Sequence, residues 1–218
     1  MNLRRLVNYV LFRDTTMKGE FRLMWRLAGA DCPKIMIDVG ANDGFYGSNS
    51  FPYVARGWRA LLIEPNPVAF AALQTRHVHR KNVVCLNVAC GSSNGQLPLW
   101  TRGQDASLST LDPASHPHYT PSEGPAPRSQ PVEVRRLDSI LVEHRFPHQL
   151  GVLSIDTEGW DCEVLLGLDL KTWRPRLIVT EDTRRPDEAT KAELLRENGY
   201  ICRHQIARDS FWVAASES

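Results

Sequence analysis

Short apolar runs alternate along the chain with stretches in which apolar residues recur at helical spacing. Such alternation indicates strands that are separated by helices. In the first half, the predicted strands are 34–39, 60–63 and 83–89, and the predicted helices are 17–30, 48–56 and 67–77. This half therefore reads as a helix followed by a βαβαβ unit, which is typical of a parallel sheet.

The same alternation resumes after residue 137. Its predicted elements are strands 152–156, 176–181, 200–207 and 210–215, and helices 138–145, 160–168 and 187–198. Asn198-Gly199 supplies a C-terminal stop for the last helix. The final two strands are joined by Arg208-Asp209 and predict an antiparallel hairpin. We therefore expect an α/β fold with a mostly parallel seven-stranded sheet and an antiparallel C-terminal hairpin.

The pattern breaks between residues 91 and 136. Short strands are predicted at 96–101 and 131–136, and a loop rich in Pro, His and Ser runs between them from Asp112 to Pro131. We expect the two strands to form a hairpin inserted after strand three. A loop of this length fits a functional lid and a mobile excursion equally well.

A turn with two glycines follows the first strand of the βαβαβ unit. Asp38-Val-Gly-Ala-Asn-Asp-Gly44 lies directly behind an apolar run, and Glu64 ends the next strand. Glycine lets the backbone approach a ligand closely, and an acid at the second strand end accepts hydrogen bonds from ribose hydroxyls. The two features together predict a nucleoside site.

The spacing of the turn bears on which nucleoside is bound. Dinucleotide sites carry G-x-G-x-x-G, because a pyrophosphate must lie against bare backbone, whereas this turn reads D-x-G-x-x-x-G. An acid ahead of the first glycine repels phosphate and suits the ammonium and sulfonium groups of S-adenosylmethionine (SAM). An NAD(P)-dependent oxidoreductase is also disfavoured because the chain has no Tyr-x-x-x-Lys motif.

Composition limits the partners and the compartment. A net charge of +1 over 218 residues favours a small-molecule partner over nucleic acid or an anionic membrane surface. The five cysteines are scattered without C-x-x-C spacing, which indicates reduced thiols in a cytoplasmic protein. The apolar run 6–12 is too short to span a bilayer, and no signal-peptide cleavage site follows it. We expect an N-terminal helical segment, 1–30, and one domain, 31–218; a homo-oligomer is left open.

Several motifs together resemble the FkbM family of methyltransferases over roughly residues 34–182. These motifs are Asp38-Val-Gly-Ala-Asn-Asp-Gly44, Gly47-Ser-Asn-Ser50, Gly57-Trp58, Ile63-Glu-Pro-Asn-Pro67, Asn87-Val-Ala89, Arg136-Leu-Asp-Ser-Ile140, Ile155-Asp-Thr-Glu-Gly159 and Glu163-Val-Leu-Leu-Gly167. The resemblance implies a Rossmann-like class I methyltransferase fold over 31–218. It also implies SAM binding and methyl transfer, usually to a hydroxyl of a sugar or secondary metabolite.

Carried onto this chain, the resemblance implies a set of cofactor contacts. The residues expected to bind SAM are Asp38, Gly40, Ala41, Asn42, Gly44, Glu64, Pro65, Asn66, Ala89 and Ser107. Ser107 and Ser109 match a serine-containing stretch of the family, which either touches the cofactor or turns the chain. Among the tryptophans, Trp160 is the one that we expect near a pocket.

Acidic residues follow strands four and five, where ligands of open α/β sheets bind. Asp156 ends strand four, Glu158 lies two residues on, and Glu181-Asp182 end strand five. We expect Asp156 and Glu181 to be catalytic, because a hydroxyl acceptor must lose its proton. Asp156, Glu181 and Asp182 are also candidate ligands of Mg²⁺. Alternatively, one acid accepts hydrogen bonds from SAM or a helix N-terminus, and the others are solvated or paired with arginines.

Three functions are compared on these observations. An O-methyltransferase is favoured, and an N- or C-methyltransferase stays open because cofactor motifs do not report the acceptor. A SAM-binding domain without transfer activity is the alternative from the class of binding proteins. The oxidoreductase is disfavoured by the glycine spacing.

Overall fold

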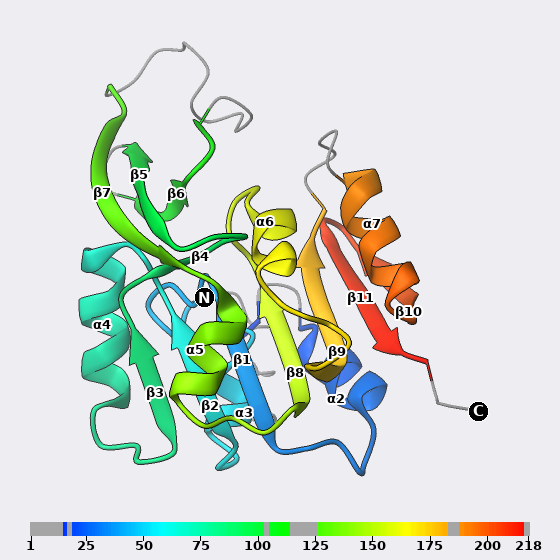
Figure 1. Cartoon of the computed structure of the whole chain (residues 1–218). Coiled ribbons are helices and arrows are strands. Elements are labelled where there is room, and N and C mark those ends of the chain that lie inside the picture. Colours follow the sequence, from blue (N-terminus) through cyan, green and yellow to red (C-terminus); the bar gives the residue numbers. More distant parts are fainter. Residues whose placement is uncertain (1–14, 17–18, 103–104, 114–125, 183–187, 216–218) are drawn as a thin grey trace.

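The computed structural model describes residues 15–16, 19–102, 105–113, 126–182 and 188–215, and a seven-stranded sheet runs through them (Figure 1). Its strands are β1 (Ile35–Val39), β2 (Arg59–Ile63), β3 (Val83–Leu86), β8 (Gln149–Ile155), β9 (Arg174–Glu181), β10 (Tyr200–Ile206) and β11 (Asp209–Ala214). The order is β10-β11-β9-β8-β1-β2-β3, and β11 is antiparallel to both of its neighbours. The predicted Rossmann-like fold with an antiparallel C-terminal hairpin is confirmed.

Helices cover both faces of this sheet. They are α2 (Phe21–Ala28), α3 (Phe51–Val54), α4 (Pro67–His77), α5 (Leu137–Glu143), α6 (Asp161–Leu166) and α7 (Glu188–Glu197). One hydrophobic core joins α5, α6 and α7 to the sheet, and a second core joins α2, α3 and α4 to its other face. Figure 1 shows α5 in front of the sheet and α2 behind it. The central strands are apolar on both faces because both faces are covered.

Two sequence-based boundaries change in the structure. The helix predicted at 48–56 is reduced to α3, because the Ser48 hydroxyl oxygen accepts the N–H of Phe51 at 3.1 Å and keeps the preceding residues in a turn. The strand predicted at 83–89 ends at Leu86. The Asn87 side chain then donates to the carbonyl oxygens of Glu64 and Pro65, at 2.8 and 3.0 Å. Of the predicted 1–30 segment, residues 1–14 and 17–18 lie outside the described residues.

A second, four-stranded sheet replaces the simple inserted hairpin that the sequence predicts. Its strands are β4 (Ala89–Cys90), β5 (Gly95–Arg102), β6 (Asp105–Thr110) and β7 (Arg128–Arg135), in the order β4-β7-β5-β6. The predicted pairing of the two flanking strands is confirmed, because β5 runs antiparallel to β7. The predicted loop 112–131 is shorter than expected, since β7 begins at Arg128, and residues 114–125 lie outside the description. This sheet stands beyond the upper ends of β1 and β2 (Figure 1).

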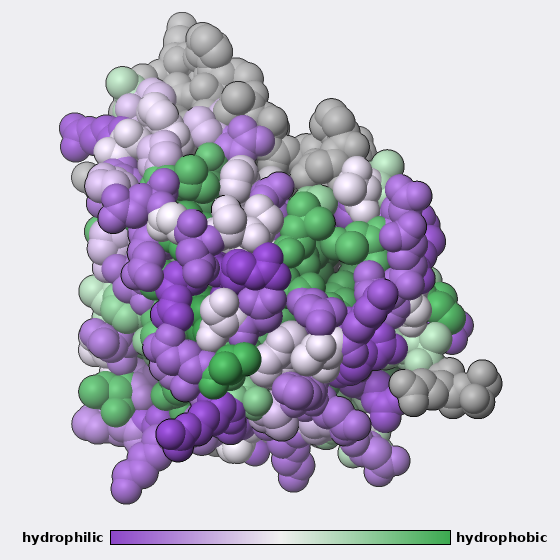
Figure 2. Space-filling model, viewed as in Figure 1, coloured by the Kyte–Doolittle hydropathy of each residue, from purple (hydrophilic) through white to green (hydrophobic). Residues whose placement is uncertain are grey.

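The surface that carries α5 and α7 is largely polar. Figure 2 shows hydrophilic residues over most of this face, with apolar residues gathered between α6 and α7. Within the described residues, no helix has the length and apolar character needed to cross a bilayer.

Candidate active site

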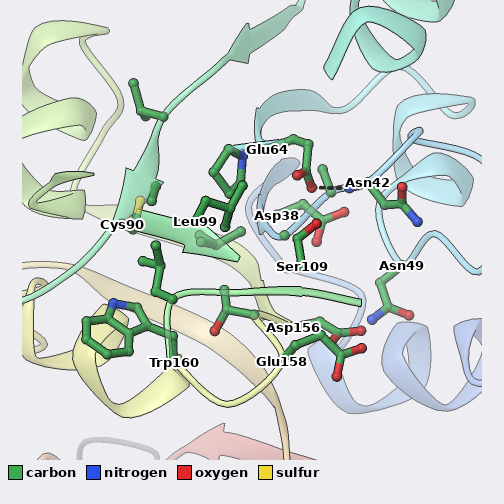
Figure 3. Close-up of a pocket in the computed structure, with 18 of the residues that line it drawn as sticks. Asp38, Asn42, Asn49, Glu64, Cys90, Leu99, Ser109, Asp156, Glu158 and Trp160 are labelled. Carbon is green, nitrogen blue, oxygen red and sulfur yellow. Dashed lines mark hydrogen bonds between the residues drawn. The ribbon is translucent and has the colours of Figure 1, made fainter. Parts of the chain in front are cut away.

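A cavity of about 330 Å³ opens between the carboxyl ends of the central strands and the four-stranded sheet (Figure 3). This volume falls in the range of small-molecule sites. Its lining residues are Asp38, Val39, Gly40, Ala41, Asn42, Tyr46, Gly47, Ser48, Asn49, Glu64, Pro65, Val88, Ala89, Cys90, Leu99, Ser109, Leu111, Asp156, Thr157, Glu158 and Trp160. The cavity therefore lies where open α/β sheets bind their ligands.

The glycine turn after β1 is shaped mainly by packing. Gly40 has φ +87°, and a Cβ placed on it would lie 1.8 Å from the carbonyl oxygen of Asp156. A Cβ on Gly44 would lie 2.4 Å from Leu73 Cδ1 and 3.0 Å from His77 Nε2. Gly40 thus lets β1 approach β8, and Gly44 lets the turn pack on α4. Gly40 also lines the cavity, whereas Gly44 does not.

Glu64 ties the end of β2 to this turn. Its Oε2 accepts the backbone N–H of Asn42 at 2.9 Å (Figure 3). Its Oε1 accepts the N–H of Asn66 at 2.7 Å. The side chain is only 5% exposed. Burial raises the pKa of Glu64 to about 7, and the two N–H donors limit this rise. Each carboxylate oxygen keeps a second lone pair with which to accept a ligand hydroxyl.

Asn66, a predicted cofactor contact, has a structural role. The Asn66 side chain is the N-cap of α4, because its Oδ1 accepts the N–H of Val68 at 2.9 Å. Its Nδ2 donates to Ser109 Oγ at 2.8 Å, so Asn66 stands behind the cavity wall while Ser109 lines it. Ser107 belongs to β6, and its side chain lies outside the description. Pro65 and Ala89 line the cavity as expected.

Asp38 is buried at the end of β1. The side chain is 3% exposed, and burial raises its pKa to about 6, although hydrogen bonds from Ser50 and Ser154 oppose the rise. Asn49 donates to the same Ser154 hydroxyl at 3.1 Å and reaches the cavity wall. A carboxylate in this position favours a ligand that brings a positive charge.

A cluster of three acids lies at the carboxyl ends of β8 and β9. Carboxylate oxygens of Asp156, Glu158 and Glu181 lie within 4.8 Å of one another, and Asp182 does not belong to this group. Figure 3 shows Asp156 and Glu158 side by side at the cavity. Arg208 contacts Glu181 Oε1 at 3.0 Å, whereas Glu181 Oε2 is buried without a hydrogen-bond partner among the described residues.

The crowding of these acids disfavours their charged forms. The Asp156 side chain is exposed to the cavity, yet protein atoms surround its carboxyl closely. This burial and the charges of Glu181 and Glu158 raise the pKa of Asp156 well above its usual range. Burial and the Glu158 charge raise the pKa of Glu181 to about 8, against the opposing effect of Arg208. Protons are therefore held here at neutral pH more readily than on ordinary carboxylates.

The cavity lining combines acids with an apolar wall. Its charged residues are Asp38, Glu64, Asp156 and Glu158, and the described residues that line it include no Lys, Arg or His. Val88, Cys90, Leu99, Leu111 and Trp160 make up the apolar part. The prediction that Trp160 lies near a pocket is confirmed. This lining opposes a phosphate and suits an apolar ring joined to a cationic group.

The lining also includes polar residues that were not predicted as site residues, among them Asn49, Tyr46 and Glu158. Asn49 falls in the Gly47-Ser-Asn-Ser50 motif, which the sequence analysis noted only as part of the family resemblance. Tyr46, at the mouth of the cavity, is 63% exposed. Glu158 reaches the cavity through a backbone with φ +52°, followed by Gly159 with φ +99°. The sequence signal for this turn was the Glu158-Gly159 pair, because glycine readily adopts a positive φ.

Comparisons with known proteins agree with this geometry. A sequence model described as "Methyltransferase FkbM domain" matches residues 38–202. A methyltransferase FkbM structure from Methylobacillus flagellatus has a TM-score of 0.52 and 16% identity, and the match covers 82% of this chain and 42% of that chain. This chain therefore spans less than half of that protein's length. A comparison with curated proteins gave no match.

Two further solved structures are similar at lower scores. Precorrin-6y C5,15-methyltransferase from Geobacter metallireducens has a TM-score of 0.48 and 13% identity, with 92% of this chain and 89% of that chain covered. A putative RNA methyltransferase from Pyrococcus horikoshii has a TM-score of 0.49 and 10% identity, with 100% of both chains covered. At these identities, the likeness to solved structures concerns the fold alone. The family is given by the match over residues 38–202, and the chain belongs to the methyltransferase FkbM domain family.

Proposed function

We propose that this protein transfers a methyl group from SAM to a hydroxyl oxygen of a small acceptor, such as a sugar or secondary metabolite. The observation that carries the proposal is the acidic lining of the cavity. Asp38, Glu64, Asp156 and Glu158 line it, and the described lining residues bring no compensating cation. An anionic cofactor such as NAD(P) is disfavoured there, whereas a sulfonium carrying an amino acid group is favoured.

The residues present fit the nucleoside part of SAM. Glu64 is buried, and the N–H groups of Asn42 and Asn66 hold its carboxylate in place, so it is a fixed acceptor for two ribose hydroxyls. Val88 and Leu99 offer an apolar wall for the adenine ring. Among the acids that line the cavity, Asp38 is nearest in sequence to the glycine turn, and it would face the cationic part of the ligand.

When bound, SAM supplies an electrophilic methyl group on a positively charged sulfur. The protein then has to bring the acceptor oxygen into line and remove its proton. Asp156 is suited to the second task, because it reaches the cavity and its pKa is raised by burial and by Glu181 and Glu158. Raising the pKa of a carboxylate makes it a stronger base toward the proton of a hydroxyl. Glu181 contributes to this role, because its neighbouring carboxylate raises the pKa of Asp156.

Mg²⁺ stays a prediction, with a revised ligand set. Asp156, Glu158 and Glu181 supply hard oxygen ligands at the spacing a divalent cation needs, and Asp182 is replaced by Glu158 in this role. A cation among these acids would also lower the pKa of the acceptor hydroxyl. The expectations of a small-molecule acceptor, of no nucleic-acid partner and of a cytoplasmic location likewise remain predictions, and so does homo-oligomerisation.

A transfer assay separates the proposal from its alternatives. Purified protein is incubated with SAM, with or without Mg²⁺, and with panels of sugars, glycosides and phenols, and S-adenosylhomocysteine is measured. We expect turnover with a hydroxyl acceptor and its loss in Asp156→Asn, while calorimetry still shows SAM binding. Product formed only with amine acceptors would replace O- by N-methylation. SAM binding without turnover on any acceptor would favour a binding domain without transfer activity.

A further inference from the structure

One buried carboxylate connects the two strand ends that carry the acids. Asp161 begins α6 and is 4% exposed. Its Oδ1 accepts the N–H of Thr157 at 3.1 Å and the Thr157 hydroxyl at 2.5 Å. Its Oδ2 accepts the N–H of Glu181 at 2.9 Å. Thus one side chain binds the loop after β8 with one oxygen and the end of β9 with the other.

These hydrogen bonds lie just beyond the end of the β8–β9 ladder. The ladder between β8 and β9 has its last pair at Ile155 and Thr180. Asp156 and Glu181 are the next residues on the two strands, so they lie where the ladder no longer fixes the separation of the strands. At this point the Asp161 carboxylate bridges the loop after β8 and the end of β9. Hydrogen bonds to a charged acceptor are stronger and shorter than neutral ones, which suits them to this role.

A buried lysine helps to keep Asp161 charged. Lys191 on α7 is 4% exposed, and its Nζ donates to the carbonyl oxygen of Glu181. Burial raises the pKa of Asp161 to about 6, while the Lys191 charge and the bonds from Thr157 and Glu181 oppose the rise. The bridge is therefore formed by a carboxylate that is mostly ionised at neutral pH.

We propose that Asp161 is a positioning residue that fixes the geometry of Asp156 relative to Glu181. The assignment of these two acids to the acceptor rests on the proposed function, but the bridge itself stands on the hydrogen bonds alone. Asp161 acts through its neighbours, and it does not line the cavity.

The bridge also has an electrostatic consequence. The Asp161 charge is among the groups that raise the pKa values of Asp156 and Glu181, together with Glu158 and Asp209, while Arg208 lowers that of Glu181. Asp161→Asn therefore removes one negative charge and one acceptor atom, since an amide nitrogen cannot accept the N–H of Glu181 or the donors of Thr157. A residue that only supported α6 would change stability without changing the protection of the Glu181 amide or the kcat of methyl transfer.

Protection of the Glu181 amide proton from hydrogen exchange, together with the kcat and KM of methyl transfer, tests this proposal. In Asp161→Asn, we expect kcat to fall while the KM for SAM stays unchanged, because the two acids lose their fixed separation while the cofactor contacts remain. The Glu181 amide should also lose protection. Glu163→Gln is the matched control, because it removes a charge from the same helix at a carboxylate that accepts the Ser92 hydroxyl and takes no part in the bridge. It should leave both measurements unchanged.

Thr157→Val gives a second test that keeps the fold and the charge. It removes the hydroxyl that donates to Asp161 Oδ1 and so weakens one arm of the bridge, and we expect the backbone amide of residue 157 to exchange faster. Unchanged Glu181 amide protection in a folded Asp161→Asn, or an equal loss of protection in Glu163→Gln, would overturn the proposal. If Asp161→Asn does not fold, unchanged exchange of the residue 157 amide in Thr157→Val overturns it. Calorimetry with S-adenosylhomocysteine is recorded separately. An absence of binding would count against the proposed function and not against the bridge.

Discussion

The Glu64 carboxylate accepts the backbone N–H of Asn42 at 2.9 Å, and this contact joins the end of β2 to the turn after β1. Asn42 has φ +49°, a conformation that non-glycine residues rarely adopt. The hydrogen bond compensates for this strain, and a charged acceptor makes it stronger. A single acid thus shapes the turn and offers oxygen atoms to the cavity.

Glu64→Gln is expected to weaken SAM binding. Glutamine keeps the size of the side chain, but its amide nitrogen cannot accept the N–H of Asn42 or Asn66 and offers one acceptor fewer to the ribose. We expect the Kd for SAM to rise about tenfold or more, which is about 1.4 kcal/mol. Calorimetry measures this change, and Glu143→Gln, at an exposed acid on α5, is the control. An unchanged Kd in Glu64→Gln would remove this residue from the site.

Gly40→Ala is expected to destabilise the protein more than Gly57→Ala. Both glycines have positive φ, at +87° and +80°, so alanine is strained by about 1–2 kcal/mol at either position. At Gly40, however, a Cβ would meet the Asp156 carbonyl oxygen at 1.8 Å, whereas at Gly57 nothing lies within 4 Å. Urea denaturation compares the two variants. Equal losses of unfolding free energy would contradict the packing role of Gly40.

Stability is expected to fall as the pH rises from about 6.5 to 8.5. Burial raises the pKa of Glu64 to about 7 and that of Glu181 to about 8, both above the unfolded value. The folded protein therefore holds more protons in this window, and the stability that they contribute is lost as pH passes through the folded pKa values. Burial lowers the pKa of His77 to about 4, so this residue makes stability rise with pH up to its unfolded pKa of about 6.5, and it opposes the fall only at the lower edge of the window.

Thermal unfolding at a series of pH values measures this effect. For a chain of this length, each kcal/mol lost lowers Tm by about 2–4 °C. Glu64→Gln should make the dependence shallower. Glu143→Gln should leave it unchanged, because Arg135 lowers the pKa of Glu143 and places its titration below the window. A Tm that rises between pH 6.5 and 8.5 would show that these carboxyls titrate normally.

Manganese binding tests the revised metal ligands. Mn²⁺ replaces Mg²⁺ at oxygen sites and is followed by its electron paramagnetic resonance signal. We expect saturable binding that Glu158→Gln weakens about tenfold or more, or about 1.4 kcal/mol. Asp182→Asn should bind as the wild type does, because Asp182 lies outside the acid cluster. Loss of binding in Asp182→Asn alone would restore the ligand set predicted from the sequence, and no saturable binding in the wild type would exclude the metal.

Much of the fold could be predicted because buried parallel strands carry unbroken apolar runs. Residues 35–37 and 60–63 are such runs, and they lie in the neighbouring parallel strands β1 and β2. The segment 105–110 was not predicted as a strand, since Asp105-Ala-Ser-Leu-Ser-Thr110 is short and polar. Its pairing with β5 is a tertiary contact that local pattern does not reveal.

In the site, the glycine turn and Glu64 were visible from the sequence, but the composition of the acid cluster was not. Successive side chains at a strand end point to opposite faces, so Glu181 and Asp182 cannot both face Asp156. Glu158 takes the third place because of a left-handed turn at 158–159, which the sequence only hints at through Gly159. Asn66 was assigned to the cofactor because its motif was recognised, whereas its side chain caps α4.

Calorimetric titration of the purified protein with SAM, S-adenosylhomocysteine and NADH tests the central claim most directly. An acidic cavity with Glu64 at its ribose end should give saturable heats for SAM and S-adenosylhomocysteine and none for NADH. Saturable binding of NADH, or no binding of either sulfur compound, would contradict the account.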